Sequence, residues 1–244
     1  MTQQEQLALA MERARKRLRQ GIGTQSERLV HSTLKYYLEP DESCHEIPID
    51  SYVADIFRKE TGQILEIQTR GFDRLRDKLE AFCQEYQVTV VYPIVREKYL
   101  CWVHPETGEI VSRRRSPRKG RATDILPEIY RLPKLQNHPN LSFLALMIDV
   151  EEYRLLDGWN RDKKRGSHRM ERLPLAIGEM VLLKEPKDFT ALLPELPEEF
   201  TRKELASAAK LSQAAVSYAV RVWERAGSIC RVGSKGRQYL YKRS

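Results

Sequence analysis

The sequence predicts an α/β fold, a sheet flanked by helices, followed by a smaller C-terminal domain. Three observations predict it. Helical and strand-like spacings alternate in the first part of the chain, a continuously apolar, β-branched segment at 88–95 follows a helical one, and residues 197–244 contain two capped helices and a hairpin pattern. A helix between two strands is the usual crossover that brings them into parallel pairing.

The composition indicates a folded protein with excess positive charge. The 244 residues are 41% hydrophobic and 31% charged, with 42 Lys and Arg against 34 Asp and Glu, a net charge of +8. These values exclude a disordered chain and allow one large core or two unequal domains. The charge suggests a polyanionic partner, although a basic surface also serves solubility.

The cysteines and the apolar segments bear on the compartment. Cys44, Cys83, Cys101 and Cys230 are widely spaced and form no Cys-x-x-Cys pair. A zinc ribbon and a disulfide framework are therefore not expected, and the thiols should be reduced. The apolar run at 7–11 is too short for a signal peptide or a membrane span. We expect a cytoplasmic protein with no membrane partner.

Residues 2–20 are predicted as a helix, with Thr2 and Glu5 at capping-box spacing. The segment 88–95 has the sequence of a central strand covered on both faces. In chain order we then expect a helix, three strands, a helix and three strands at 25–38, 44–49, 51–57, 63–69, 72–86, 88–95, 98–104 and 141–156.

Basic residues concentrate in three segments. The run "RARKRLR" at 13–19 lies on the first helix and is expected to be a solvated face, with phosphate contact as the alternative. The stretches "SRRRSPRKGR" at 112–121 and "RDKKRGSHRMER" at 161–172 are predicted as basic loops. We expect their cations to contact phosphates, the alternative being ordinary solvated loops. The residues of these loops that we expect to bind DNA are Arg114, Arg115, Lys164 and Arg165.

A predicted hairpin at 51–70 carries polar residues within strand-like sequence. Asp55 lies on its first strand, Glu66 and Gln68 lie on its second, and Gly62 lies in the turn. Side chains on one face of a strand repeat every two residues, so Glu66 and Gln68 share a face. A loop of two or four residues places Asp55 opposite one of them and brings all three together, whereas a three-residue loop does not.

Two carboxylates and an amide oxygen at close range predict a site for a hard divalent cation. The carboxylates repel each other unless positive charge lies between them, and Mg²⁺ takes oxygen ligands while keeping several waters. Such an ion at a phosphodiester polarises the phosphoryl oxygen and activates a water. The alternative is that these residues form a polar row on the solvent face of the hairpin.

The hairpin and the helix before it contain a short motif: Glu27, Asp55 in "VADIF", and Glu66-Ile67-Gln68 in "LEIQT". In these residues, and in the order of its elements, the segment at about 24–105 resembles the PD-(D/E)XK nuclease-like superfamily. The resemblance implies a restriction-endonuclease-like mixed sheet flanked by helices. It also implies that Asp55 and Glu66 bind Mg²⁺ or Mn²⁺, that Gln68 orients a water and that Glu27 completes the catalytic set.

Position 68 departs from the family pattern, which has a lysine there. Gln68 can orient a water, but it carries no charge to stabilise hydroxide or the transition state. Arg70, Arg74 or Lys78, just beyond the motif, could supply that charge.

Three nearby residues have structural alternatives. Glu27 also stands at capping-box spacing in "TQSE", so its carboxylate could close the helix end instead. Asp50 is an outside candidate that is expected to turn the chain. His31, one helical turn after Glu27, is close enough to approach the site, but a lone histidine on a helix is more often structural.

Two helices and a hairpin are predicted at the C-terminal end. Thr201 and Glu204 have capping-box spacing, and Ser212 can cap a second helix that stops at Gly227. The strands "SICRV" and "RQYLYK" flank a "GSKG" turn. This pattern resembles a winged helix-turn-helix domain, with its first helix within 187–193.

The winged-helix resemblance implies a DNA reader. Outward-facing residues of the second helix suit a major groove, and basic residues of the hairpin suit a wing on phosphates. The alternative is a winged helix used for protein contact. The residues expected at DNA are Gln213, Ser217, Tyr218, Arg221, Lys235 and Arg237.

These patterns divide the chain into a basic helix at 1–23, a nuclease-like domain with basic loops at 24–185 and a winged helix-turn-helix domain at 186–244. They predict a divalent-metal-dependent DNA nuclease. The alternative is a non-catalytic DNA-binding or regulatory protein on a degenerate nuclease scaffold, and RNA is a further candidate partner. Cutting both strands often implies two active sites, as in a homodimer, but no sequence feature marks a dimer surface.

Overall fold

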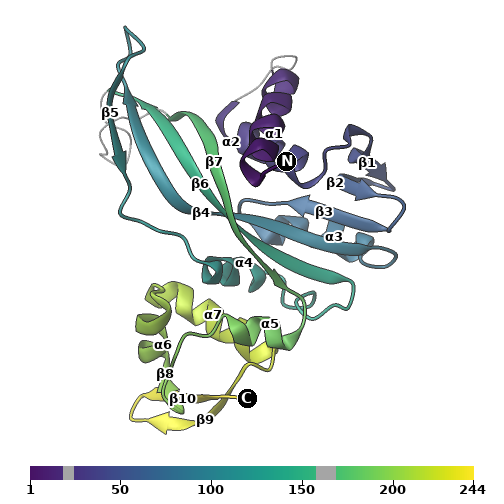
Figure 1. Ribbon diagram of the computed structural model, residues 1–244. Helices are drawn as coiled ribbons and strands as arrows, with labels where there is room; N and C mark the ends of the chain where they lie inside the picture. The colour runs from purple at the N-terminus through teal and green to yellow at the C-terminus, as the bar shows by residue number, and fades with distance from the viewer. Residues whose placement is uncertain (19–24, 158–168) are drawn as a thin grey trace.

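The computed structural model describes residues 1–18, 25–157 and 169–244, without the side chains of 25–28. Within these residues the chain has the predicted α/β architecture, a mixed sheet flanked by helices (Figure 1). The first elements are α1 (Gln3–Leu18), α2 (Gln25–Leu38), η1 (Glu42–Cys44), β1 (His45–Ile49), β2 (Tyr52–Arg58), β3 (Gln63–Ile67), η2 (Phe72–Leu75), α3 (Arg76–Phe82) and β4 (Gln87–Val103). The middle elements are β5 (Ile110–Arg115), η3 (Ala122–Ile125), α4 (Leu126–Ile129), β6 (Leu141–Leu155) and β7 (Arg169–Leu183). The last are α5 (Pro186–Ala191), β8 (Glu199–Thr201), α6 (Arg202–Ala209), α7 (Gln213–Arg225), β9 (Ile229–Lys235) and β10 (Gln238–Arg243).

Seven strands of the described residues form one sheet in the order β1-β2-β3-β4-β6-β7, with β5 paired to β4. The strands β1, β2 and β3 form an antiparallel meander, whereas β4 is parallel to both β3 and β6. The predicted crossover between β3 and β4 is confirmed, although the helical segment is a 3₁₀ turn, η2, followed by the short helix α3. The central position of β4 agrees with its continuous apolar sequence.

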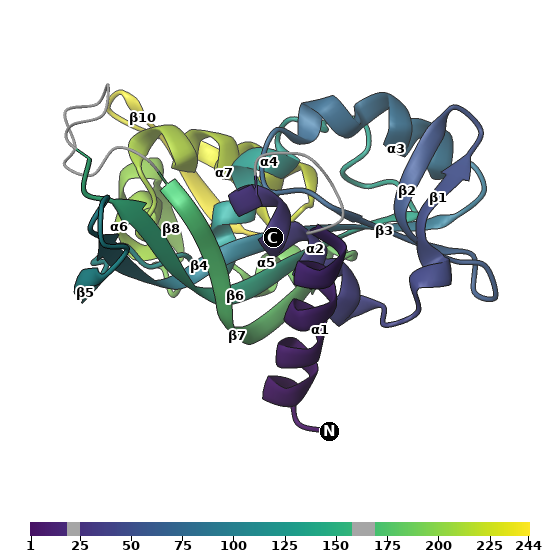
Figure 2. The ribbon, with the colours of Figure 1, turned by 90° about the horizontal axis from the view of Figure 1, so that it is seen from above.

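Helices cover both faces of the sheet (Figure 2). Leu7 of α1 and Leu34 of α2 pack on one face, against strand residues such as Leu65. Phe72 of η2 packs on the other face with Ile64, as do buried residues of α3 and α4. Neighbouring residues of β3 therefore enter different cores, because side chains alternate along a strand.

The strands β4, β6 and β7 are long, with 17, 15 and 15 residues. Their far ends and β5 form an arm, residues 97–103, 110–115, 149–155 and 169–176, which projects from the body (Figure 1). The prediction of two strands at 88–95 and 98–104 is therefore wrong. They are one strand, irregular between Val95 and Glu97, because continuous pairing with β6 bridges the bulge.

The stretch 112–121 was predicted to be a loop, and this prediction is wrong for its first part. Arg114 and Arg115 lie on β5, because pairing with the end of β4 orders this basic sequence as a strand. The second predicted basic loop lies largely in 158–168, outside the described residues.

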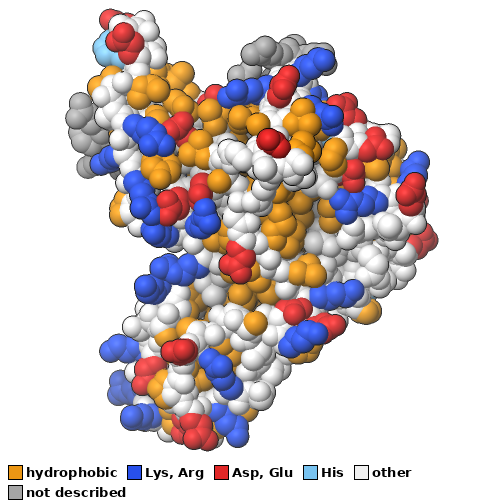
Figure 3. Space-filling model, in the orientation of Figure 1, with side chains coloured by type: hydrophobic (Ala, Val, Ile, Leu, Met, Phe, Trp, Pro, Cys, Tyr) orange, Lys and Arg blue, Asp and Glu red, His pale blue; other side chains and the backbone are white. Residues whose placement is uncertain are grey.

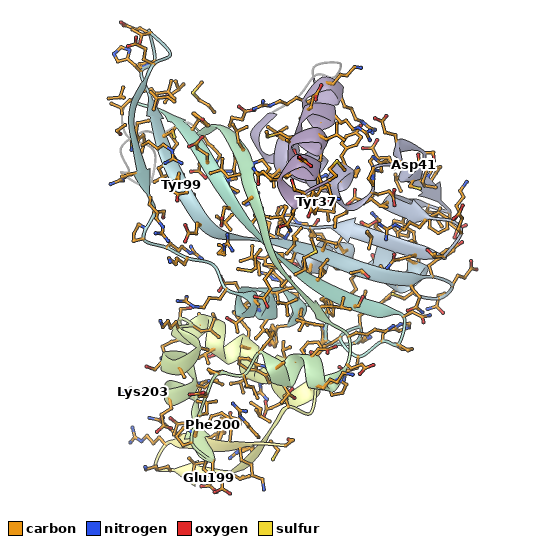
Figure 4. The ribbon with its side chains drawn as sticks, in the orientation of Figure 1. Tyr37, Asp41, Tyr99, Glu199, Phe200 and Lys203 are labelled. Carbon is orange, nitrogen blue, oxygen red and sulfur yellow. The ribbon has the colours of Figure 1, made fainter. Side chains whose placement is uncertain are left out.

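The C-terminal part consists of α5 to α7 and the small sheet β8-β10-β9. The predicted caps are confirmed: the Thr201 hydroxyl accepts from the N–H of Glu204, and the Ser212 hydroxyl accepts from that of Ala215. Phe200, labelled in Figure 4 in this part of the chain, is fully buried. It belongs to the same apolar cluster as Phe72. The hydrophobic core is therefore continuous between the two parts of the chain that the sequence divided after residue 185.

Cys44, Cys83, Cys101 and Cys230 are all free thiols. None of the helices in the described part of the chain is both long enough and apolar enough to cross a membrane.

Candidate functional site

The two predicted carboxylates lie where the β2–β3 hairpin opens. The strands pair from Arg58 with Gln63 to Ile56 with Leu65, so the loop between them is the four residues 59–62. Gly62 ends the loop with φ +64°, a conformation that side chains disfavour. One step further along the register, Asp55 stands opposite Glu66, as the prediction for a four-residue loop required.

At this pair, side chains replace the main-chain ladder. The N–H of Asp55 donates to Glu66 Oε1 at 3.1 Å, and the N–H of Ile67 donates to Asp55 Oδ2 at 2.9 Å. Each carboxylate is thus held by the opposite strand through one of its oxygens. The other oxygen of each faces a lysine.

Lys78 of α3 faces Glu66. Its Nζ donates to Glu66 Oε2 at 2.5 Å, and the Glu66 side chain is 3% exposed. The start of the helical segment is fixed from a distance, because the Glu128 carboxylate accepts the N–H groups of Gly71 and Phe72 at 2.8 and 3.1 Å. Lys78 is one of the three cations proposed to replace the missing motif lysine, and it contacts Glu66 directly.

The helix α2 brings a histidine and a second lysine to Asp55. His31 Nε2 lies 3.3 Å from Asp55 Oδ2, and Lys35 Nζ lies 3.7 Å from Oδ1. Lys35 is 6% exposed and also donates to Glu46 at 3.1 Å. Lys35 was not among the residues expected from the sequence. Its four-residue spacing from His31, which puts both on one helix face, was the available signal.

The two carboxylates differ in charge state. Burial alone would raise the pKa of Asp55, but the hydrogen bond and charge of His31, with Lys35 and the N–H of Ile67, lower it to about 2. Burial and then the negative charge of Asp55 raise the pKa of Glu66 to about 7, against the opposing effect of Lys78. Asp55 is therefore the permanent anion of the pair, and Glu66 holds a proton readily.

The pair opens into a cavity of about 660 Å³, lined by both carboxylates, both lysines and Gln68. The Gln68 amide nitrogen donates to the carbonyl oxygen of Arg70 at 2.7 Å. Arg17 of α1 also lines the cavity and pairs with Glu46 at 2.5 Å. The basic end of α1 therefore belongs to this site as well as to the solvated surface.

Residues 28–184, more than half of the chain, match the model of a protein family described as "Domain of unknown function (DUF8091)". The chain belongs to this family. An uncharacterized protein of Treponema pallidum (strain Nichols) is 29% identical over 229 residues, which are 91% of this chain and 87% of the relative. No solved structure matches the chain significantly.

The DUF8091 segment contains the carboxylate pair and the cations beside it, namely His31, Lys35, Asp55, Glu66 and Lys78, whereas Arg17 precedes the segment. It ends at residue 184, so the helices α5 to α7 and the C-terminal hairpin lie beyond it. The candidate chemistry and the candidate reader thus occupy different segments.

The donor set of the DUF8091 site fits a magnesium ion. Mg²⁺ takes one or two carboxylates and completes its shell with waters. Asp55 and Glu66 each accept a main-chain N–H group through one oxygen, and the second oxygen of each faces a lysine that a bound ion would meet. A positive ion between the two carboxylates would oppose the repulsion from Asp55 that helps to raise the pKa of Glu66. Among the described residues no group of three or more His, Cys, Asp or Glu side chains is arranged for a metal, so waters would supply the remaining ligands.

Other predicted residues lie apart from the pair or outside the described residues. The side chain of Glu27, and Lys164 and Arg165, fall in the latter class. Asp50 has φ +50° between β1 and β2, which agrees with the turning role expected for it. Arg74 is exposed.

The predicted DNA contacts form three groups. On α7, Gln213 and Arg221 are exposed, Ser217 is half-buried, and the Tyr218 ring lies 4.8 Å from the ring of Tyr130. Tyr218 is itself 43% exposed, although its ring contacts that of Tyr130. The others are exposed, in the C-terminal hairpin and on β5, namely Lys235, Arg237, Arg114 and Arg115.

Proposed function

We propose that this protein is a divalent-metal-dependent DNA nuclease that hydrolyses phosphodiesters at the opened hairpin with Mg²⁺ or Mn²⁺. The observation that carries the proposal is the pairing of Asp55 with Glu66 beside Lys78, whose Nζ lies 2.5 Å from Glu66. Two fixed carboxylates and a lysine at one cavity combine ligands for a metal with positive charge for the phosphate.

The proposal includes the restriction-endonuclease-like fold of the PD-(D/E)XK superfamily. Its support is the order of α2, the β1–β3 meander, the crossover α3 and the central strand β4, with the acidic pair on β2 and β3. The fold would act on DNA in the cytoplasm, and cutting both strands would call for two copies of the chain.

Each residue of the site has a role in this proposal. Asp55 and Glu66 hold the metal, which when bound polarises the phosphoryl oxygen and lowers the pKa of a water. Lys78 stabilises the negative charge that develops on the phosphate, the role of the lysine absent from position 68. Gln68 orients the water, and Glu27 of α2 completes the set.

The C-terminal part is proposed as a winged helix-turn-helix DNA reader. Its support is the confirmed capping of α6 and α7, the short connection between them and the β9–β10 hairpin that follows. Gln213 and Arg221 on α7 would contact the major groove, and Lys235 and Arg237 would contact phosphates.

Cleavage of plasmid, linear duplex and single-stranded DNA with Mg²⁺, Mn²⁺ or EDTA tests the proposal. We expect metal-dependent cleavage by the wild type and none by Asp55→Asn or Glu66→Gln. Glu60→Gln, in the exposed loop of the same hairpin, is the matched control and should cleave normally. A wild-type protein that cuts none of these substrates with either metal overturns the proposal.

A non-catalytic DNA-binding protein on a degenerate nuclease scaffold is the second candidate. One observation favours it: the amide nitrogen of Gln68 is engaged by the Arg70 carbonyl oxygen at 2.7 Å. In that case the wild type and Glu66→Gln would bind DNA alike, and neither would cut it.

A further inference from the structure

Three cavities follow one another along the molecule. The cavity at the hairpin site shares Thr69 with a second of about 660 Å³, which reaches Ala215 on α7. The second shares Lys98 with a third of about 610 Å³ on the arm. The three cavities therefore form a series, which we call the groove, from the carboxylate pair, past the start of α7, to the arm.

The two faces of the arm differ in charge. On one face the guanidinium groups are paired, Arg113 with Glu151 at 2.6 Å and Arg115 with Glu97. Tyr99, labelled in Figure 4, belongs to this face and lies under Arg113. The opposite face, which we call the groove face, carries Lys98, Leu100, Trp102, Arg114, Glu152, Arg154 and Arg172.

A single carboxylate organises the cations of the groove face. Glu152 is 0% exposed and accepts from Arg154 and Arg172 at 2.6 Å, with Lys98 Nζ at 3.8 Å. Arg169 also lies 3.7 Å from Glu152, and one carboxylate cannot neutralise four cations, so the cluster around Glu152 keeps a positive charge. Burial lowers the pKa of Lys98, and the neighbouring guanidinium groups lower it further, against the effect of Glu152. Figure 3 shows Lys and Arg side chains on the arm and on the C-terminal part, with Asp and Glu side chains among them.

The third cavity combines apolar walls with a cationic rim. Trp102 forms a wall, and the Arg114 guanidinium lies 6.0 Å from the centre of its ring. The other walls are Leu100, Val111 and Leu156, and the rim is Lys98, Arg114 and Arg154. A flat ring in an apolar cavity beside cations suits a nucleotide, whose base stacks on aromatic side chains while its phosphate meets positive charge.

The segment after β5 borders the second cavity, which lies between the hairpin site and the arm. The N–H of Gly120 donates to the carbonyl oxygen of Val95 at 3.0 Å, and a Cβ at Gly120 would lie 2.5 Å from that oxygen. Only glycine allows this approach to β4. Arg118, two residues before Gly120, lines the second cavity, which Lys98 also lines.

We propose that the groove face binds a single DNA strand, with one base stacked on Trp102 and its phosphates at Lys98, Arg114 and Arg154. The link from this strand to cleavage rests on the proposed nuclease function, since the groove begins at the carboxylate pair. Bases in a duplex are stacked on their neighbours and cannot offer a face to Trp102. The substrate would then be DNA with an unpaired segment.

Anisotropy of a labelled oligothymidylate, and of a duplex of equal length, tests this with the full chain in EDTA. Trp102→Leu keeps an apolar wall without the ring, and we expect it to weaken single-strand binding about fivefold or more while duplex binding stays constant. Trp102→Phe should restore most of the affinity. Wild-type single-strand affinity in Trp102→Leu, or equal losses for both DNAs, overturns the inference.

Two neighbouring arginines give a matched pair on opposite faces. Arg114→Gln should weaken single-strand binding and Arg113→Gln should not, although both remove one charge from β5. Equal effects of the two contradict the assignment to the groove face.

The same measurements separate this inference from the proposed nuclease activity. Glu66→Gln in EDTA should bind the strand at least as tightly as the wild type. Trp102-dependent binding without cleavage by any form rejects the catalysis and retains the strand site. Metal-dependent cleavage, together with single-strand binding that does not change in Trp102→Leu, retains the nuclease activity and rejects the strand site.

Discussion

Asp55 and Glu66 brace each other across the opened hairpin: the N–H of Asp55 donates to the Glu66 carboxylate at 3.1 Å, while the Asp55 carboxylate accepts the N–H of Ile67 at 2.9 Å. Neither side chain can turn away without leaving an N–H group unpaired, which is costly in a buried position. The bracing therefore keeps two like charges close together. His31 keeps the pKa of Asp55 near 2, whereas burial and Asp55 raise that of Glu66 to about 7.

Replacing Lys78 by methionine should lower the rate of metal-dependent DNA cleavage about 10²- to 10³-fold, the usual effect of removing one transition-state stabilising group. The reason is that Lys78, one of the proposed replacement cations, contacts the Glu66 carboxylate at 2.5 Å. Single-turnover cleavage with saturating Mg²⁺ measures it. Arg74→Met, in the turn before α3, is the control and should cleave normally. A Lys78→Met protein with the wild-type rate would remove the lysine from the mechanism.

The hairpin and the C-terminal helices were predictable from sequence because local signals determine them. Gly62 marks the turn, although the sequence allowed loops of two, three or four residues, and the four-residue loop of the structure sets Asp55 opposite Glu66. Thr201 and Ser212 fix the starts of α6 and α7 by their own hydrogen bonds. Each of these features depends on residues at most a few positions apart.

The remainder depends on contacts that are distant in sequence. Lys78 could not be chosen over Arg70 or Arg74 because Glu128, 57 residues from Gly71, fixes the direction in which the helical segment begins. The strand β5 was taken for a loop because its basic residues gain order only from pairing with β4. Tertiary context overrides local preference at both places.

The ionised carboxylate of Glu152 should make the free energy of unfolding depend on pH. Burial would raise its pKa, but Arg172, Lys98 and Arg154 lower it to about 2 from its usual 4.5. A lowered folded-state pKa means that the stabilisation is present above pH 4.5 and is lost as the pH falls toward 2. Each pKa unit is worth about 1.4 kcal/mol, so the loss is on the order of 2 kcal/mol after discounting for the part-exposed arginines.

Urea unfolding between pH 7 and pH 3 measures this contribution as a difference between variants. The wild type should exceed Glu152→Gln in free energy of unfolding at pH 7, and the gap should narrow below pH 4.5. Glu179→Gln, at an exposed position of β7, should follow the wild type throughout. A gap that stays constant with pH would mean that packing, not charge, is what Glu152 contributes.

The glycine at 120 should be intolerant of a side chain. A Cβ there would lie 2.5 Å from Val95 O and 2.6 Å from the Ile94 side chain, and the main-chain atom cannot yield easily. Gly120→Ala should lower the free energy of unfolding by about 1–3 kcal/mol. Gly233→Ala on β9 meets nothing within 4 Å and should change it by less than about 0.5 kcal/mol. Denaturant unfolding of both proteins decides, and equal effects would contradict the close approach.

Arg221 should contribute to duplex binding and not to cleavage chemistry. It is 66% exposed on α7, and its contact with Glu224, at 3.6 Å, is a surface pair that holds it weakly. If its guanidinium meets a phosphate, Arg221→Ala will weaken duplex binding evenly across sequences and lower the salt slope of the affinity by about one. If it reads a base, one position of the preferred site will become degenerate and the slope will hardly change. Titrations of duplex DNA at several salt concentrations distinguish the two, with Lys187→Ala on α5 as the control.

Because α7 lies beyond the DUF8091 segment, Arg221→Ala should still cut DNA at the wild-type rate once the DNA is saturating. A slower saturated rate would show that α7 helps to build the catalytic site.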